Sequence, residues 1–258
     1  ERPRAVGSQT DGKAAVAVLR IPHISNFTDF DPLAAVPGLS VHFVQTPQDL
    51  SMFRAVILPG SKNTRHDLEW LKTSGWQSHL DAFRQAGGHI TGICGGYQMM
   101  GLAVHDPDGL EGAPGTTDGL GLLPAETALK APKTTTLSRF AWGEIEGTGY
   151  EIHMGRTDLT DGRSLLRVLE RNGRRVDDVD GCVTENGQAM GTYMHGLFDT
   201  PAITRRWLDA VGLEHLDTGD TPAGPAARDR EYDRLAEHFG QHVDTEAILR
   251  LVQRMPPP

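Results

Sequence analysis

The sequence predicts an α/β protein: a doubly wound, mostly parallel sheet flanked by helices, with an antiparallel extension in the second half of the chain. Up to about residue 105, short apolar runs that end in turn residues alternate with helical patterns, which is typical of parallel sheets. Beyond that point, loops and alternating strands take over. Glycine makes up 30 of the 258 residues, which favours a fold with tight turns and close backbone contacts.

The first half supplies the parallel sheet. Residues 1–13 are polar and lack periodicity, and we expect them to be the remnant of an interdomain linker. Short apolar runs predict buried strands, and amphipathic or glycine-terminated runs predict helices. The strands are expected at 14–21, 41–46, 54–60 and 89–94, and the helices at 76–88 and 97–104. Functional residues should then gather where the strands end, at the carboxyl edge of the sheet.

The second half carries the antiparallel extension. Residues 106–135 are rich in loops, and strands are expected within 141–155 and 181–196. The dipeptide Asn186-Gly187 predicts a hairpin in the later stretch. The helices that follow are expected at 201–211, 228–240 and 244–255. We assign 14–212 to one domain and 213–258 to a C-terminal helical extension packed on the same domain.

Composition excludes several classes of protein. The net charge of −9 and the isoelectric point near 5.6 argue against nucleic acid and membrane surfaces as partners. No apolar run approaches the roughly 18 residues of a membrane span, and the N-terminus lacks the apolar core of a signal peptide. Two cysteines, Cys94 and Cys182, are too few for a disulfide framework. We therefore expect a cytoplasmic protein.

The strongest local signal is the run GICGG, which lies between a predicted strand and a predicted helix. It fits G-x-C-x-G, the thiol form of the nucleophile elbow, in which small neighbours let a strained turn expose its central residue. Cys94 would then stand at a helix N-terminus, whose dipole favours the thiolate. The N–H of Gly95 would be placed to stabilise an oxyanion. The alternative is an inert buried cysteine, which is how we interpret Cys182.

A thiol nucleophile needs a base, and His195 is the best-placed candidate. It ends the second arm of the predicted hairpin and precedes Gly196, which puts it at the end of a strand. His153, in GYEIHMG, is the rival. Gly60, in Pro59-Gly60-Ser61, follows a predicted strand and would add its N–H to the oxyanion hole, although an ordinary turn gives the same pattern.

The sequence offers no motif for a nucleotide or a metal. GSKNT lacks the spacing of a phosphate-binding loop, and G-x-x-x-x-G-K-[ST] does not occur. His238 and His242 stand four apart on a predicted helix, but a metal site needs more ligands and there is no H-E-x-x-H. We therefore expect no metal and no other cofactor in this domain.

Three motifs taken together resemble the class I, triad-type glutamine amidotransferase domains of the cobyric acid synthase and cobyrinate diamide synthase branch. They are PGSKNT, GICGGYQMMG and HGLF. RIPHISNFTDFDPL and GYEIHMG narrow the resemblance to the cobyric acid synthase family. It extends from about Ala14 to the C-terminal helices. The resemblance implies the flavodoxin-like amidotransferase fold and the hydrolysis of L-glutamine.

The resemblance also implies roles for single residues. Cys94 is similar to the nucleophile that forms a γ-glutamyl thioester, and His195 to the base that later protonates the departing ammonia. Gly60 and Gly95 match the oxyanion-hole positions. Gln98 matches a glutamine that contacts the substrate side chain.

Arg139, in SRFAWGEI, is similar in position to an arginine that grips the glutamine α-carboxylate in related enzymes, where the guanidinium fork suits a carboxylate. A solvated surface arginine gives the same pattern.

The chain departs from the wider class after its histidine. Most triad amidotransferases carry His-x-Glu, whereas this sequence reads His195-Gly196-Leu197. The cobyric acid synthase branch shares this departure. Candidates for the third catalytic residue are Glu151, Asp199 or a residue of the synthetase part, and we expect no third member within the chain. The loop 20–33 is expected to face the synthetase domain.

The resemblance implies a larger enzyme. Its N-terminal synthetase domain, absent from this chain, would use ATP and magnesium to amidate carboxylates of the corrinoid adenosylcobyrinic acid a,c-diamide in cobalamin biosynthesis. The present chain would be the C-terminal part that supplies ammonia. The alternatives are the glutaminase subunit of a cell-wall lipid precursor amidotransferase, a cysteine hydrolase or peptidase on the same fold, and a non-catalytic docking module.

Overall fold

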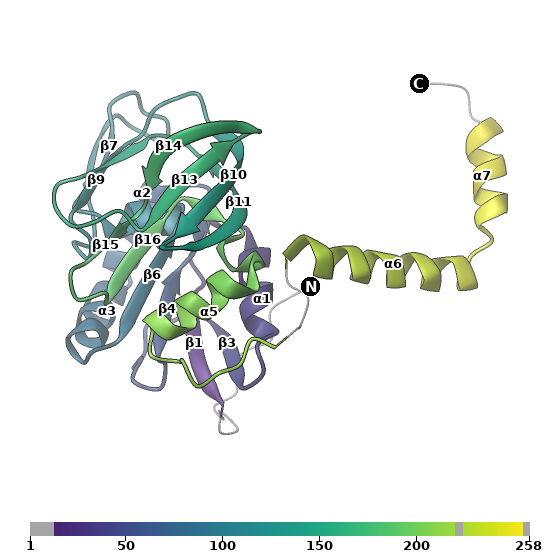
Figure 1. Ribbon diagram of the computed structural model, residues 1–258. Helices are drawn as coiled ribbons and strands as arrows, with labels where there is room; N and C mark the ends of the chain where they lie inside the picture. The colour runs from purple at the N-terminus through teal and green to yellow at the C-terminus, as the bar shows by residue number, and fades with distance from the viewer. Residues whose placement is uncertain (1–12, 220–223, 255–258) are drawn as a thin grey trace.

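The computed structural model describes residues 13–219 and 224–254. Apart from Lys13, the predicted linker lies outside the described residues. Figure 1 shows a layered α/β body, from which the C-terminal helices extend. Within the described residues no helix is both long enough and apolar enough to cross a membrane.

The central sheet is mostly parallel, as predicted. Its strand order is β15-β16-β6-β4-β1-β3, and only β15 runs antiparallel to its neighbour. The bounds are β1 Ala14–Leu19, β3 Leu39–Val44, β4 Ala55–Leu58, β6 His89–Ile93, β15 Cys182–Val183 and β16 Ala189–Thr192. The Asn-Gly turn joins β15 to β16, so the predicted hairpin is confirmed, but its second arm is also a parallel partner of β6.

Helices cover both faces of this sheet because the strands are apolar on both sides. In β1, Ala15, Ala17 and Leu19 belong to one buried cluster, together with side chains of α2 and α3. Val16 and Val18 belong to a second cluster on the other face, together with side chains of α1 and α5. The helices are α1 Asp31–Ala34, α2 Thr64–Thr73, α3 Trp76–Gln85, α4 Gly95–Met100 and α5 Pro201–Ala210.

Two further sheets and a short ribbon lie outside the central sheet, and their pairings are antiparallel except that of β7 with β9, which is parallel. One sheet has the order β14-β13-β10-β11-β17 and the other β12-β9-β7-β8, while β2 pairs with β5. Their bounds are β2 Ile24–Ser25, β5 Gly60–Ser61, β7 Ala103–Asp106, β8 Gly115–Asp118, β9 Ala125–Ala128, β10 Thr134–Trp142, β11 Ile145–His153, β12 Arg156–Leu159, β13 Leu166–Arg171, β14 Arg174–Asp180 and β17 Met194–His195. Two short 3-10 helices, η1 Phe27–Phe30 and η2 Leu197–Asp199, flank the carboxyl edge of the central sheet.

Two predicted elements need correction. The helix expected at 97–104 is α4, which ends at Met100, and 103–106 form strand β7. Gly101 ends the helix where the backbone runs close to β9, since a Cβ on Gly101 would approach Ala125 O to 2.5 Å. Helix α2 was not predicted at all, although Asn63 caps it by accepting a hydrogen bond from His66 N at 3.1 Å.

The C-terminal extension divides into two parts. Leu213 and Leu216 are buried in the core of the domain. The helices α6 Gly224–His242 and α7 Thr245–Arg254 instead extend away from the body in Figure 1. The described large apolar side chains of these helices are exposed, including Tyr232 and Leu249. The start of α6 does lie against η2, where a Cβ on Gly224 would approach Asp199 Cβ to 2.5 Å. Packing of the whole extension on the domain stays a prediction.

Candidate active site

Cys94 stands on the sharp turn between β6 and α4. Its backbone has φ 52° and ψ −110°, a strained conformation for a residue other than glycine. The turn depends on small neighbours: a Cβ on Gly92 would lie 2.7 Å from Tyr97 N, and one on Gly96 would overlap Leu58 O. The thiol is 6% exposed, and its Sγ lies 3.6 Å from Ile152 O of β11. The predicted elbow is therefore present.

His195 lies beside this cysteine and is completely buried in β17. Its ring stacks on Tyr150 of β11, with centroids 5.1 Å apart. The side-chain amide nitrogen of Asn26 lies within 3.0 Å of both ring nitrogens. The rival histidine, His153, is placed differently: it stacks on Tyr193 with centroids 3.8 Å apart, and its Nε2 lies 3.6 Å from Glu151 Oε2.

The histidine is held by a carboxylate that the sequence analysis did not identify. Asp29 Oδ2 lies 2.7 Å from His195 Nδ1, and Asp29 Oδ1 accepts a hydrogen bond from Gly196 N at 3.0 Å. Asp29 is only 3% exposed. Nδ1 thus faces Asp29, and the ring is also hydrogen-bonded to Cys94.

These contacts correct one expectation. We expected no third member within the chain, but a carboxylate of the chain, that of Asp29, does lie against His195. The loop 20–33 brings Asp29 to the histidine through η1. That this loop faces a synthetase domain stays a prediction. The available signal was the run SNFTD, which had no assigned role. Neither Asp29 nor Asn26 lies near His195 in sequence, so no local spacing rule could connect them.

The charge of the site follows from these contacts. Burial lowers the pKa of His195, but hydrogen bonding to Asp29 and to Cys94 outweighs it and raises the pKa to about 10. At neutral pH the ring is therefore protonated and can act as a proton donor beside the thiol of Cys94. Such a pair is a ready nucleophile and proton donor.

Gly60 and Gly95 adjoin this pair, as expected. A Cβ on Gly60 in β5 would lie 3.1 Å from His195 Cε1, and one on Gly95 would lie 2.8 Å from Ser61 N. Gly95 is the first residue of α4, so its N–H has no acceptor inside the helix. The two backbones thus border the space above the thiol.

Gln98 is buried behind the elbow. Its Oε1 accepts a hydrogen bond from Thr64 Oγ1 at 3.0 Å, and its Nε2 donates to Met154 O and to Tyr193 Oη, both at 3.1 Å. The amide therefore ties α4 to the segment after β11. Contact with a substrate side chain stays a prediction.

The structure does not bring Arg139 to Cys94. Its guanidinium pairs with Glu146 at 3.0 Å and with Glu170 at 3.8 Å, and its side chain is 41% exposed. Neighbouring residues of a strand point to opposite faces, and the neighbour Ser138 points inward to Glu151. Arg139 therefore lies on the outer face of β10.

A cavity of about 380 Å³ lies on the other side of β11, and Glu151, His153 and Arg171 line it. Burial raises the pKa of Glu151, but hydrogen bonds from His153, Arg171 and Ser138 lower it to about 2, so this carboxylate is ionised. Arg171 Nε donates to Glu151 Oε1 at 2.8 Å. Glu151 is thus committed to this network.

The elbow thiol, the carboxylate-held histidine and the α/β sheet define a cysteine-dependent amide hydrolase of the nucleophile-elbow type. The chain belongs to the CobB/CobQ-like glutamine amidotransferase domain family, whose model matches residues 15–203. The expectation drawn from the motifs is therefore confirmed, and the chain is an enzyme domain that uses glutamine.

Similar proteins include several cobyric acid synthases. The one from Chlorobium phaeobacteroides is 46% identical over 96% of this chain and 49% of its own length. The synthase from Chlorobaculum tepidum is 47% identical over 93% of this chain and 47% of its own length. The synthase from Salmonella agona is 41% identical over 93% of this chain and 49% of its own length. The chain thus spans about half the length of these relatives.

Solved structures share the fold. PurLQS from Thermotoga maritima has a TM-score of 0.57 at 15% identity, with 77% of this chain and 97% of that chain covered. A crystal structure of a glutamine amidotransferase has a TM-score of 0.56 at 18% identity, and the match covers 76% of this chain and 98% of that chain. The predicted fold class is confirmed.

Proposed function

We propose that this chain hydrolyses L-glutamine with Cys94, His195 and Asp29 and supplies the ammonia to an amide-forming enzyme that acts on a corrinoid. The observation that carries the proposal is the alignment of Asp29, His195 and Cys94 at the nucleophile elbow. The resemblance to cobyric acid synthases supports the corrinoid.

In the first half-reaction, the Cys94 thiolate attacks the side-chain carbonyl carbon of glutamine. The oxyanion that forms accepts hydrogen bonds from the N–H groups of Gly60 and Gly95. His195 then passes its Nε2 proton to the amide nitrogen, the C–N bond breaks, and ammonia departs to leave a γ-glutamyl thioester.

In the second half-reaction, His195 accepts a proton from water, and the hydroxide attacks the thioester. The C–S bond breaks, glutamate leaves, and the thiolate–imidazolium pair is restored. Asp29 fixes the ring through its hydrogen bond and stabilises the positive charge of the ring.

The remaining half of the enzyme is part of the proposal. We propose that a synthetase domain of the full-length protein binds ATP and magnesium and activates carboxylates of adenosylcobyrinic acid a,c-diamide for attack by ammonia. We place the whole protein in the cytoplasm, which agrees with two free, buried cysteines. The relatives favour this substrate over the cell-wall lipid precursor.

The test is glutamine turnover by the full-length protein, measured as glutamate and ammonia. We expect equal amounts of both, and none from the Cys94→Ser variant. With corrinoid, ATP and magnesium present, the ammonia should appear as corrinoid amide. Glutamate release that is unchanged in Cys94→Ser would contradict the role of the thiol, and turnover of peptides in place of glutamine would favour a peptidase.

A further inference from the structure

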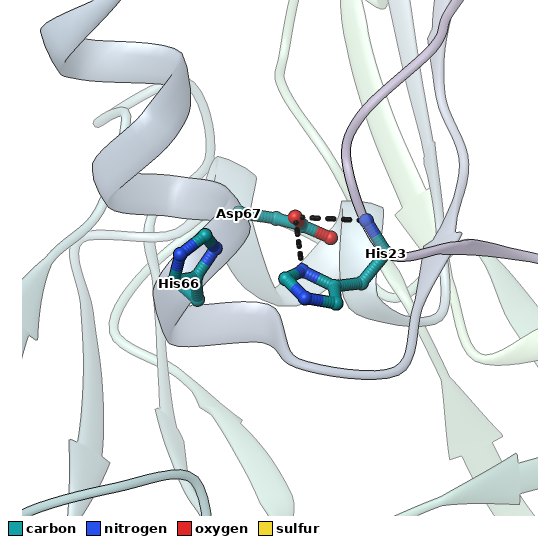
Figure 2. A group of neighbouring side chains, drawn as sticks. All are labelled: His23, His66 and Asp67. Carbon is teal, nitrogen blue, oxygen red and sulfur yellow. Dashed lines mark hydrogen bonds and ion pairs between the residues drawn. The ribbon is translucent and has the colours of Figure 1, made fainter.

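A second cluster of side chains lies next to the catalytic site. His23 stands just before β2, while His66 and Asp67 lie in the first turn of α2 (Figure 2). One potential ligand atom from each residue lies within 4.8 Å of the others. The His23 and His66 rings meet edge to face, with centroids 4.7 Å apart.

The carboxylate of this cluster is held in place. Asp67 Oδ1 accepts a hydrogen bond from His23 N at 3.1 Å and lies 2.9 Å from His23 Nδ1. Asp67 Oδ2 accepts from Ser61 Oγ at 2.5 Å. The cluster therefore forms without rearrangement of the backbone, which is the preorganisation that a binding site needs.

The charge of the cluster favours a cation. Asp67 is completely buried, and within the described residues no lysine or arginine lies within 4.0 Å of its carboxylate; its ion-pair partner there is His23. A buried carboxylate is costly unless a cation is paired with it. The side chain of His23 is 40% exposed, and His66 is exposed, so an ion can enter from solvent.

We propose that His23, His66 and Asp67 bind a divalent transition-metal ion such as Zn²⁺. Imidazole and carboxylate are ligands that suit zinc, and three protein ligands leave a coordination position for water. Zinc bonds of about 2.0–2.2 Å bring ligand atoms to roughly 3–4 Å from one another, so His66 has only a short distance to move. His23 carries its proton on Nε2 in the bound form, which frees Nδ1 for the metal.

Such a metal would act on the position of the catalytic carboxylate. His23 belongs to the same segment, residues 20–33, that carries Asn26 and Asp29, and Asp67 is bonded to Ser61, the neighbour of Gly60. The bound ion would tie this segment to α2 without touching glutamine or the thiol. The inference goes beyond the proposed function and departs from the expectation of no metal in this domain.

Zinc binding tests this site. The protein is used as its Cys94→Ser variant, because the catalytic thiolate also binds zinc. Calorimetric titration with Zn²⁺ should show one ion per chain, and His66→Ala should weaken the binding by at least about 10-fold. Zn²⁺ should also raise the melting temperature of Cys94→Ser but not that of Cys94→Ser/His66→Ala.

The matched control is His242→Ala, which removes one member of the other histidine pair, His238 and His242, whose rings lie 4.2 Å apart. This variant should bind Zn²⁺ like its parent. Any of three results would overturn the proposal. They are loss of Zn²⁺ binding in His242→Ala, equal Zn²⁺ affinity in His66→Ala and its parent, and no saturable Zn²⁺ binding at all. None of these outcomes depends on whether the protein hydrolyses glutamine.

Discussion

Asp29 Oδ2 lies 2.7 Å from His195 Nδ1, although 166 residues separate the two along the chain. The other oxygen of Asp29 accepts a hydrogen bond from Gly196 N, the residue next to the histidine. The carboxylate thus fixes the ring and the adjacent backbone together. We propose that Asp29 takes the role that Glu plays in the His-x-Glu sequence of the wider class.

The first prediction concerns Asp29→Asn. Asparagine keeps the shape of the side chain but loses the charge and can favour the wrong tautomer of His195, so kcat for glutamine hydrolysis should fall about 10²–10⁴-fold. Steady-state ammonia release measures this. Asp108→Asn, at an exposed aspartate, is the control and should match the wild type. A loss below 3-fold, within roughly 1 kcal/mol, would remove Asp29 from the mechanism.

The second prediction concerns stability at high pH. The pKa of His195 is raised to about 10, whereas an unfolded histidine titrates near 6.5. The folded state binds this proton more tightly than the unfolded state does, so the protonated ring stabilises the fold. This stabilisation is fully present below about pH 6.5 and is lost as the pH rises to about 10. Urea unfolding should therefore show a stability gap between wild type and His195→Gln that narrows over this range. A gap that is constant with pH would contradict the thiolate–imidazolium arrangement.

The third prediction concerns Glu151→Gln. The variant leaves the partly buried Arg171 without its main partner, and the free energy of unfolding should fall by about 1–3 kcal/mol at neutral pH. Since the pKa of Glu151 is lowered from 4.5 to about 2, its contribution is present above about pH 4.5 and is lost as the pH falls toward 2.

Chemical unfolding at neutral and acidic pH checks this. The difference from wild type should shrink in acid, and Glu185→Gln, at an exposed position, should be neutral at both pH values. An effect of Glu185→Gln as large as that of Glu151→Gln would point to net charge rather than to this ion pair.

The fourth prediction concerns Gly60→Ala. The added methyl would lie 3.1 Å from His195 Cε1 and 2.9 Å from Ser25 Oγ, so the histidine must shift. We expect kcat to fall about 10²-fold while the protein stays folded. Gly240→Ala in α6 is the matched control, because its methyl meets no atom within 4 Å, and it should be fully active. Equal activity of both variants would mean that β5 does not border the reacting atoms.

The sequence was sufficient for features that depend on short-range patterns. Alternating apolar strands and helices predicted the parallel sheet, and the glycines around Cys94 predicted the elbow, because both reflect the local geometry of the backbone. The histidine was predicted at the end of the hairpin arm, and it lies just beyond that arm, in β17, because β16 ends at Thr192. In each case the residues that decide the structure are close together in the chain.

The features that were missed depend on contacts between distant residues. Asp29 reaches His195 only after η1 and β17 come together, and the run SNFTD around it does not indicate a partner 166 residues away. Arg139 was misplaced because a strand residue faces the site or the solvent according to register, which the neighbouring strands set. The helix predicted over 97–104 was too long because β9 approaches Gly101 from elsewhere in the chain.

The central claim is that Cys94 is a nucleophile activated by His195 and Asp29. The most direct measurement is mass spectrometry of the protein after incubation with 6-diazo-5-oxo-norleucine, a reactive glutamine analogue. We expect one adduct per chain on the peptide that contains Cys94, formed more slowly in Asp29→Asn. Cys182, whose thiol pKa burial raises to about 11, should stay unlabelled. No adduct on Cys94 in the full-length protein, or equal labelling of both cysteines, would contradict the account.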